Sequence, residues 1–152
     1  AYVYFKNKED LLIVLLENVM DRFYQIAEYL FEPASKQEAL EIISRQVKEF
    51  LEMAVNERAM MLVFSEAIGI SQAVSNKWTE IRNKFINRIA KDIEYSQTHD
   101  LARTDVVPKL IARAWFYTNE MYLWELVKNP EAFSIPEVVY NITALYTGGL
   151  YK

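Results

Sequence analysis

Apolar residues recur every three or four positions along most of the chain, which is the spacing of helices with one buried face. The first such segment runs from Asn7, a good N-cap residue, to Phe31, and Pro33 ends it. A later segment, from Val74 to Ile93, repeats the same period over a longer stretch. The 3 glycines and 4 prolines separate the periodic segments rather than interrupt them. The pattern predicts an all-α protein, an antiparallel bundle of helices.

Capping residues predict the remaining helix boundaries. Ser35 and Ser134 each precede a glutamate by three positions, which is the capping-box arrangement at the start of a helix. Asn56 is expected to cap a shorter helix, with Gly69 as its C-cap. Pro108 is expected in the first turn of a further helix, where its missing N–H costs little.

The helix that begins at Pro108 is apolar on nearly all sides up to Val127. Only Lys109, Arg113 and Glu120 interrupt it, in a narrow polar strip. A helix of this kind in a protein without membrane spans must be buried on more than one side. We therefore expect it to contact both its own subunit and a partner.

Composition narrows the function classes. Of 152 residues, 52% are hydrophobic and 14% are aromatic, a surplus of rings that indicates an apolar cavity or a large interface. There is no cysteine, which excludes disulfides, thiolate metal sites and a cysteine nucleophile and fits a cytoplasmic protein. No apolar run is long enough to span a membrane.

The net charge of −4 argues against nucleic-acid binding by the chain as a whole, so that a DNA contact would need a local basic site. One basic stripe lies opposite the apolar face of the Val74–Ile93 segment: Lys77, Lys84, Arg88 and Lys91. It is either a phosphate-binding surface or the solvated side of an amphipathic helix, and flanking acids favour the solvated side.

The opening residues, AYVYFKNKEDLL, carry the most specific motif in the chain. They resemble the junction of tetracycline-repressor (TetR) family regulators, Tyr-x-Tyr/His-Phe-x-Ser/Asn-Lys-Glu-x-Leu, where the recognition helix ends and the linking helix begins. Every motif position from Tyr2 to Leu11 matches, whereas Ala1 stands where a larger aliphatic residue is more usual. The order of the later helices also resembles the regulatory domain of that family.

The resemblance implies a bundle of the TetR C-terminal regulatory type. Residues 1–7 would be the remnant of a helix-turn-helix DNA-binding domain, and 8–152 the helical ligand-binding and dimerisation domain. Most of the DNA-binding domain would precede Tyr2, and specific operator binding would require it. Phosphate contacts are assigned by resemblance to four residues: Tyr2, Tyr4, Lys6 and Lys8.

Two sets of residues are expected to form sites. Side chains from different helices should converge on a pocket for a lipophilic or aromatic effector, where the resemblance also places one: Phe23, Phe50, Met61, Phe64, Ser65, Trp78, Phe85, Trp115, Asn119 and Tyr122. The last two helices should form a twofold dimer through a second set: Trp115, Trp124, Val138, Ile142, Leu145 and Tyr146.

The predicted function is ligand-responsive transcriptional regulation, with repression relieved by the effector. The alternatives are a helical dimerisation module without a ligand and an unrecognised small-molecule enzyme. We expect no enzyme, cofactor or metal, because there is no glycine-rich phosphate loop and the lone His99 cannot supply a metal-ligand set. A fatty acid or acyl-CoA and a planar drug-like molecule remain equally open as effectors.

Overall fold

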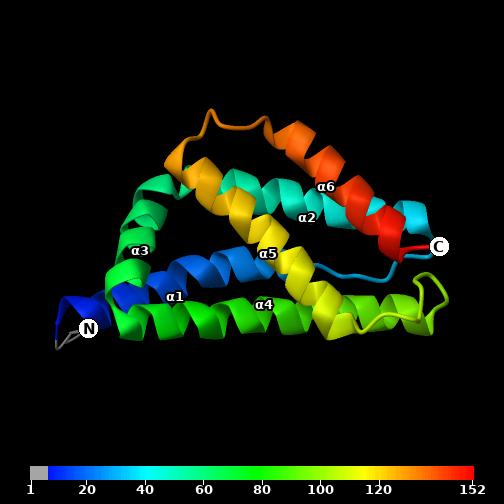
Figure 1. Ribbon diagram of the computed structural model, residues 1–152, viewed down its shortest axis with the longest axis horizontal. Helices are drawn as coiled ribbons and strands as arrows, with labels where there is room; N and C mark the ends of the chain where they lie inside the picture. Colours follow the sequence, from blue (N-terminus) through cyan, green and yellow to red (C-terminus); the bar gives the residue numbers. More distant parts are fainter. Residues whose placement is uncertain (1–6) are drawn as a thin grey trace.

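A computed structural model of the chain describes residues 7–152, and these form helices joined by short connections (Figure 1). The elements are α1 (Lys8–Ala27), α2 (Lys36–Asn56), α3 (Arg58–Ile70), α4 (Gln72–Thr98), α5 (Pro108–Lys128) and α6 (Ile135–Leu150). The described residues contain no strand, so the all-α prediction is confirmed. Three of the predicted phosphate contacts, Tyr2, Tyr4 and Lys6, lie outside the described residues.

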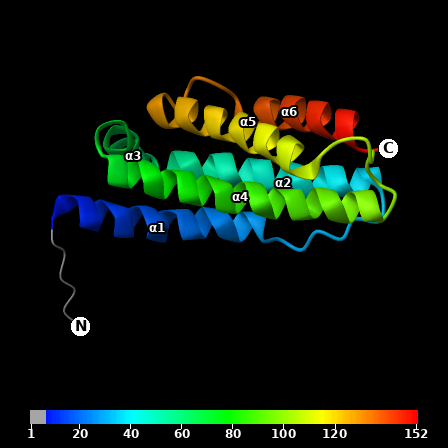
Figure 2. The same cartoon turned by 60° about the horizontal axis from the view of Figure 1, so that its bottom comes forward.

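The helices lie in three layers. Helices α2 and α4 run in opposite directions in the middle, with α1 on one side and α5 and α6 on the other (Figure 2). Helix α5 crosses diagonally over both α4 and α2, while α6 packs on α2 (Figure 1). Because α5 leans across two helices, it closes one side of the space between them.

Polar caps begin three of the helices as the sequence predicts. The side chains of Asn7, Ser35 and Ser134 each accept a hydrogen bond from the backbone N–H three residues ahead, at 2.9, 3.1 and 3.4 Å. Pro108 occupies the first position of α5. These caps satisfy N–H groups that have no partner inside the helix.

Helix α1 ends at Ala27, earlier than the predicted end at Phe31. Side chains from two other helices bond to the carbonyls that a longer helix would have satisfied itself. Gln46 donates to the Ile26 carbonyl at 3.0 Å, and Arg88 donates to the Ala27 carbonyl at 3.2 Å. Because the terminal carbonyls are satisfied in this way, the chain can leave the helix and still bury Phe31.

The predicted ends of the short helix are wrong. Asn56 is the last residue of α2 rather than a cap, and α3 continues through Gly69 to Ile70 with no glycine in the left-handed conformation. Ser71 makes the break instead. It is the C-cap of α3 and the N-cap of α4, and its hydroxyl accepts a hydrogen bond from the Val74 N–H at 3.2 Å.

Aromatic rings from four helices meet at the centre of the bundle. Phe23 of α1 lies edge-on to Phe50 of α2, with 5.4 Å between the ring centroids. Phe85 of α4 lies 6.1 Å from Phe50 and 5.1 Å from Phe116 of α5. Burial of each such ring contributes roughly 1.5–3 kcal/mol, so this cluster holds the layers together.

Among the helices described, none combines the length and apolar character that crossing a bilayer requires.

Candidate functional site

A small cavity lies beside this aromatic cluster, between α1, α2, α4 and α5, and Tyr146 of α6 and Tyr151 near the end of the chain also line it. Its volume is about 70 Å³. Eight aromatic side chains line it: Phe23, Phe31, Phe50, Phe85, Trp115, Phe116, Tyr146 and Tyr151. Pockets for drug-sized ligands are several times larger, roughly 300–1,000 Å³, so a ligand of that size would have to separate the helices.

Half of the predicted pocket residues line this cavity: Phe23, Phe50, Phe85, Trp115 and Asn119. The other half lie elsewhere. Met61 and Phe64 are fully buried in the core, and Ser65 is half-buried on α3. Trp78 belongs to a separate polar cluster, and Tyr122 lies edge-on to Phe133. Helical spacing predicted which face of each helix turns inward, but not which level of the bundle is hollow.

The cavity also has a polar part that the sequence analysis missed. Its polar lining includes Gln46, Asp92 and the hydroxyl-bearing Tyr146 and Tyr151. One signal was available. Asp92 follows Phe85 by seven positions and so continues the apolar stripe of α4 rather than its solvated face.

Asp92 is a half-buried carboxylate with little compensation. Its side chain is 16% exposed, and the Arg88 guanidinium lies 3.3 Å away. No other group in residues 7–152 forms an ion pair or hydrogen bond with its side-chain oxygens. Burial raises the pKa of Asp92 to about 7, and Arg88 opposes that rise only in part. The carboxylate therefore gains stabilisation from any further donor that reaches it.

Each of the two amides of the cavity donates one N–H to a backbone carbonyl. Gln46 donates to Ile26, and Asn119 donates to the Trp115 carbonyl at 2.9 Å. The carbonyl oxygens of both amides form no hydrogen bond within the described part of the chain. Asp92 and both amides therefore offer acceptor atoms to the cavity.

The end of the chain supplies the last wall. Backbone pairing between Ala102 and Tyr151 holds the residues after α6 against the connection that follows α4. The Tyr151 hydroxyl lies 3.0 Å from the Ser96 hydroxyl, and burial raises the pKa of Tyr151 to about 12. Burial raises the pKa of Tyr146 well above its usual value, with Tyr151 and Asp92 adding to the effect. Both phenols are therefore neutral at physiological pH.

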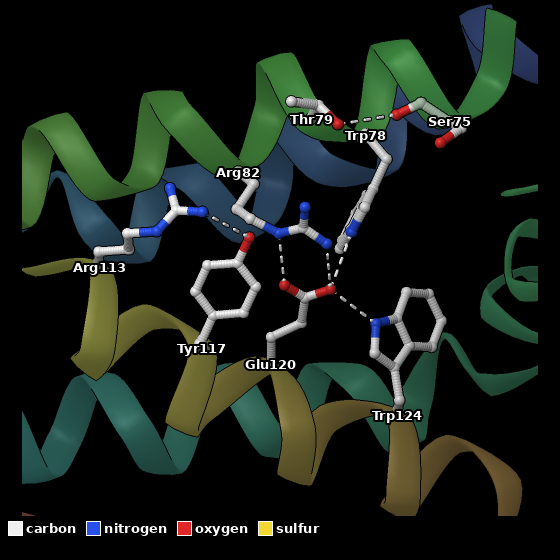
Figure 3. Close-up of polar contacts among 8 residues, drawn as sticks. All are labelled: Ser75, Trp78, Thr79, Arg82, Arg113, Tyr117, Glu120 and Trp124. Carbon is white, nitrogen blue, oxygen red and sulfur yellow. Dashed lines mark hydrogen bonds and ion pairs between the residues drawn. The ribbon is translucent and has the colours of Figure 1, made fainter. Parts of the chain in front are cut away.

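A second carboxylate, Glu120, lies buried outside the cavity between α4 and α5 (Figure 3). The indole N–H groups of Trp78 and Trp124 donate to one of its oxygens at 2.8 and 2.9 Å. Arg82 donates to both oxygens at 2.8 and 3.0 Å. Burial alone would raise the pKa of Glu120, but hydrogen bonds from Arg82, Trp124 and Trp78 lower it below its usual value.

This cluster corrects the expected polar strip of α5. Lys109 and Arg113 are exposed as expected, whereas Glu120 is only 5% exposed. The basic stripe of α4 is also not wholly solvated, because Arg88 bridges Asp92 and the end of α1. Glu120 departs from the expected strip because it pairs with Arg82 of another helix, and Arg88 departs because it pairs with Asp92 within α4 and donates to the end of α1.

The predicted dimer residues are mostly covered within one chain. Val138 and Ile142 are buried in the core, and the Trp115 and Tyr146 rings stack on each other at 4.1 Å. Trp124 is half-buried, and Leu145 is 79% exposed. A partner on α5 and α6 would therefore contact Leu145 and its exposed neighbours.

The structure also describes the surroundings of Lys8 and His99, which the sequence analysis considered as candidate site residues. Lys8 is exposed in the first turn of α1. His99 stacks on Tyr95 with 3.9 Å between the ring centroids. Within residues 7–152, no group of three or more His, Cys, Asp or Glu side chains is placed to hold a metal ion.

In comparisons with known proteins, no family model matches the chain and no curated protein matches it. The fold and the site themselves define, for the described residues, an all-helical protein with a small aromatic cavity that one half-buried carboxylate lines.

Proposed function

We propose that the chain is the regulatory part of a TetR-type transcription factor, in which a small molecule in the cavity changes the position of α1. One observation carries the proposal: polar groups at the cavity hold the C-terminal end of α1. Gln46 binds that end directly, and Asp92 is linked to it through Arg88. The opening motif, which resembles the junction with a DNA-binding domain, leads directly into this helix.

Contacts along α1 can carry a displacement toward its N-terminal end. Ser71, at the break between α3 and α4, donates to Glu9 at 2.5 Å. Lys77 of α4 lies 3.5 Å from Glu17. A ligand larger than the cavity would push the aromatic walls apart and strain these contacts. The ligand changes DNA affinity only to the extent that it prefers one position of α1, and a 100-fold preference corresponds to about 2.7 kcal/mol.

The proposed regulator is a homodimer that uses the outer faces of α5 and α6. Leu110, Tyr117 and Met121 are exposed along one side of α5. Tyr140 and Leu145 are 75% and 79% exposed on α6. A set of large apolar side chains on adjacent helices is typical of a protein–protein interface.

Leu145→Glu tests the dimer. We expect the unmodified protein to sediment as a dimer and the variant as a monomer with unchanged helicity, because the charge would be buried at the twofold interface. Leu30→Glu is the matched control, since Leu30 is 75% exposed in the connection between α1 and α2. An unmodified protein that is monomeric at all concentrations, or a Leu145 variant as dimeric as the control, would contradict the interface.

The regulatory function is tested with the full-length gene product. It is used to select DNA from a random library, and the selected DNA is then titrated with and without the small molecule that co-purifies with the protein. A palindromic site that the small molecule releases would support the proposal. Failure to enrich any sequence, with a dimer that carries no small molecule, would instead support the alternative of a dimerisation module without a ligand.

A further inference from the structure

Three polar side chains that line the cavity have acceptor oxygens without a partner in the described chain. Asp92 has one ion-pair partner, and its second carboxylate oxygen has no partner in the described chain. Gln46 and Asn119 each donate one N–H to a backbone carbonyl, and their carbonyl oxygens have no hydrogen-bond partner in the described chain. A ligand that pairs with the carboxylate and the two amide oxygens must bring hydrogen-bond donors.

The walls of the cavity favour a cation. Asp92 is the one lining residue of formal charge among those described, and that charge is negative. Eight aromatic side chains surround it, and the faces of such rings attract a cation within about 6 Å of their centroids. A carboxylate with aromatic walls is a common environment for a protonated amine.

We infer that the effector is a lipophilic amine, whose apolar body lies among the aromatic rings and whose ammonium group pairs with Asp92. This inference rests on the proposed ligand-binding function and deepens it. It separates the effector classes that the sequence left open, because a fatty acid or an acyl-CoA would bring a negative charge toward Asp92 and the two amide oxygens. Like charges in a poorly hydrated site repel each other strongly.

The same contact has a consequence for α1. Arg88 holds both Asp92 and the Ala27 carbonyl. An ammonium group on the second oxygen of Asp92 places a second positive charge near Arg88, and their repulsion weakens the hold of Arg88 on the carboxylate. The amine would thereby weaken the attachment of the end of α1, which gives the cavity a specific route to the helix.

The test uses three probes with the same body and different head groups: phenylpropylamine, phenylpropanol and phenylpropionate. Binding to the full-length protein is measured by calorimetry at neutral pH. We expect the amine to bind about tenfold or more tightly than the alcohol, and the acid to bind most weakly, because only the amine makes a charged hydrogen bond to Asp92. Asp92→Asn should remove this preference and leave alcohol binding within about twofold.

Glu94→Gln is the matched control, because it removes an exposed acid from the same helix two positions away. The circular dichroism spectrum of each variant establishes that it is folded. Equal or tighter binding of the alcohol or the acid, or an amine preference that survives Asp92→Asn, would overturn the inference and leave a ligand sensor of another specificity. If no probe binds and native mass spectrometry shows no small molecule on the purified protein, both the inference and the proposed function are wrong.

Discussion

Glu120, which is buried, and Asp92, which is half-buried, have opposite surroundings. Glu120 accepts hydrogen bonds from two indoles and from Nε and Nη2 of Arg82, and its side chain is 7% exposed. Asp92 has only Arg88 at 3.3 Å, and its side chain is 16% exposed. Desolvation disfavours the ionised form of both, but hydrogen bonds reverse the effect for Glu120 alone. Glu120 therefore joins α5 to α4, whereas Asp92 lacks donors that a ligand can supply.

Removal of the Glu120 side chain should have the largest effect on stability. In Glu120→Ala, the partly buried Arg82 loses its counter-charge and two indole N–H groups lose their acceptor. We expect the free energy of unfolding to fall by about 3–5 kcal/mol in urea denaturation. Glu125→Ala, at an exposed position of the same helix, should change it by less than about 0.5 kcal/mol. A loss below about 1 kcal/mol for Glu120→Ala would show that the cluster is not a stabilising link.

Asp92→Asn should raise the free energy of unfolding, whereas Glu120→Ala should lower it. The pKa of Asp92 in the folded protein is about 7, above its usual 3.8, so the folded state binds this proton more tightly than the unfolded state. The contribution of Asp92 to the free energy of unfolding therefore falls as the pH rises from about 4 to about 7. Because one pKa unit corresponds to about 1.4 kcal/mol, we expect Asp92→Asn to become more stabilising by about 2–3 kcal/mol between about pH 5 and about pH 8.

Urea denaturation at both pH values checks this prediction. Glu120 provides the contrast, because its pKa is lowered and its stabilisation is lost only when the pH falls below the range in which carboxylates ordinarily ionise. A destabilising Asp92→Asn substitution at the higher pH would mean that Arg88 compensates Asp92 fully.

Gln46→Ala should have the smallest effect, confined to one end of α1. The variant loses the hydrogen bond to the Ile26 carbonyl. We expect a loss of about 0.5–1.5 kcal/mol. We also expect faster amide hydrogen exchange in the last turn of α1, with unchanged exchange in α5. Uniform acceleration across all helices would contradict a local attachment, as would no acceleration at all.

Local signals in the sequence predicted much of the fold. Asn7, Ser35 and Ser134 cap helices as their positions suggest, because a cap needs only residues within one turn. The end of α1 could not be predicted in the same way. Its terminal carbonyls are satisfied by Gln46 and Arg88, which lie on other helices.

The candidate site was also predicted only in part, because some of its features depend on contacts between helices. Periodicity predicted that Phe23, Phe50 and Phe85 face a common interior, and the structure brings them together at the cavity. The environments of Asp92 and Glu120 depend on partners from other turns and other helices. Spacing alone therefore did not distinguish a buried acid from a solvated one, although Asp92 continues the stripe of Phe85.

The most direct test of the contrast is an NMR titration of the protein with carbon-13-labelled aspartate and glutamate carboxyl groups. The account predicts that Asp92 titrates with a pKa of about 7 and Glu120 with a pKa below its ordinary value. Phenylpropylamine should then lower the pKa of Asp92 and leave that of Glu120 unchanged. An Asp92 carboxyl with a pKa at or below its usual 3.8 in the free protein would contradict the account, because the chain itself would already supply its partners.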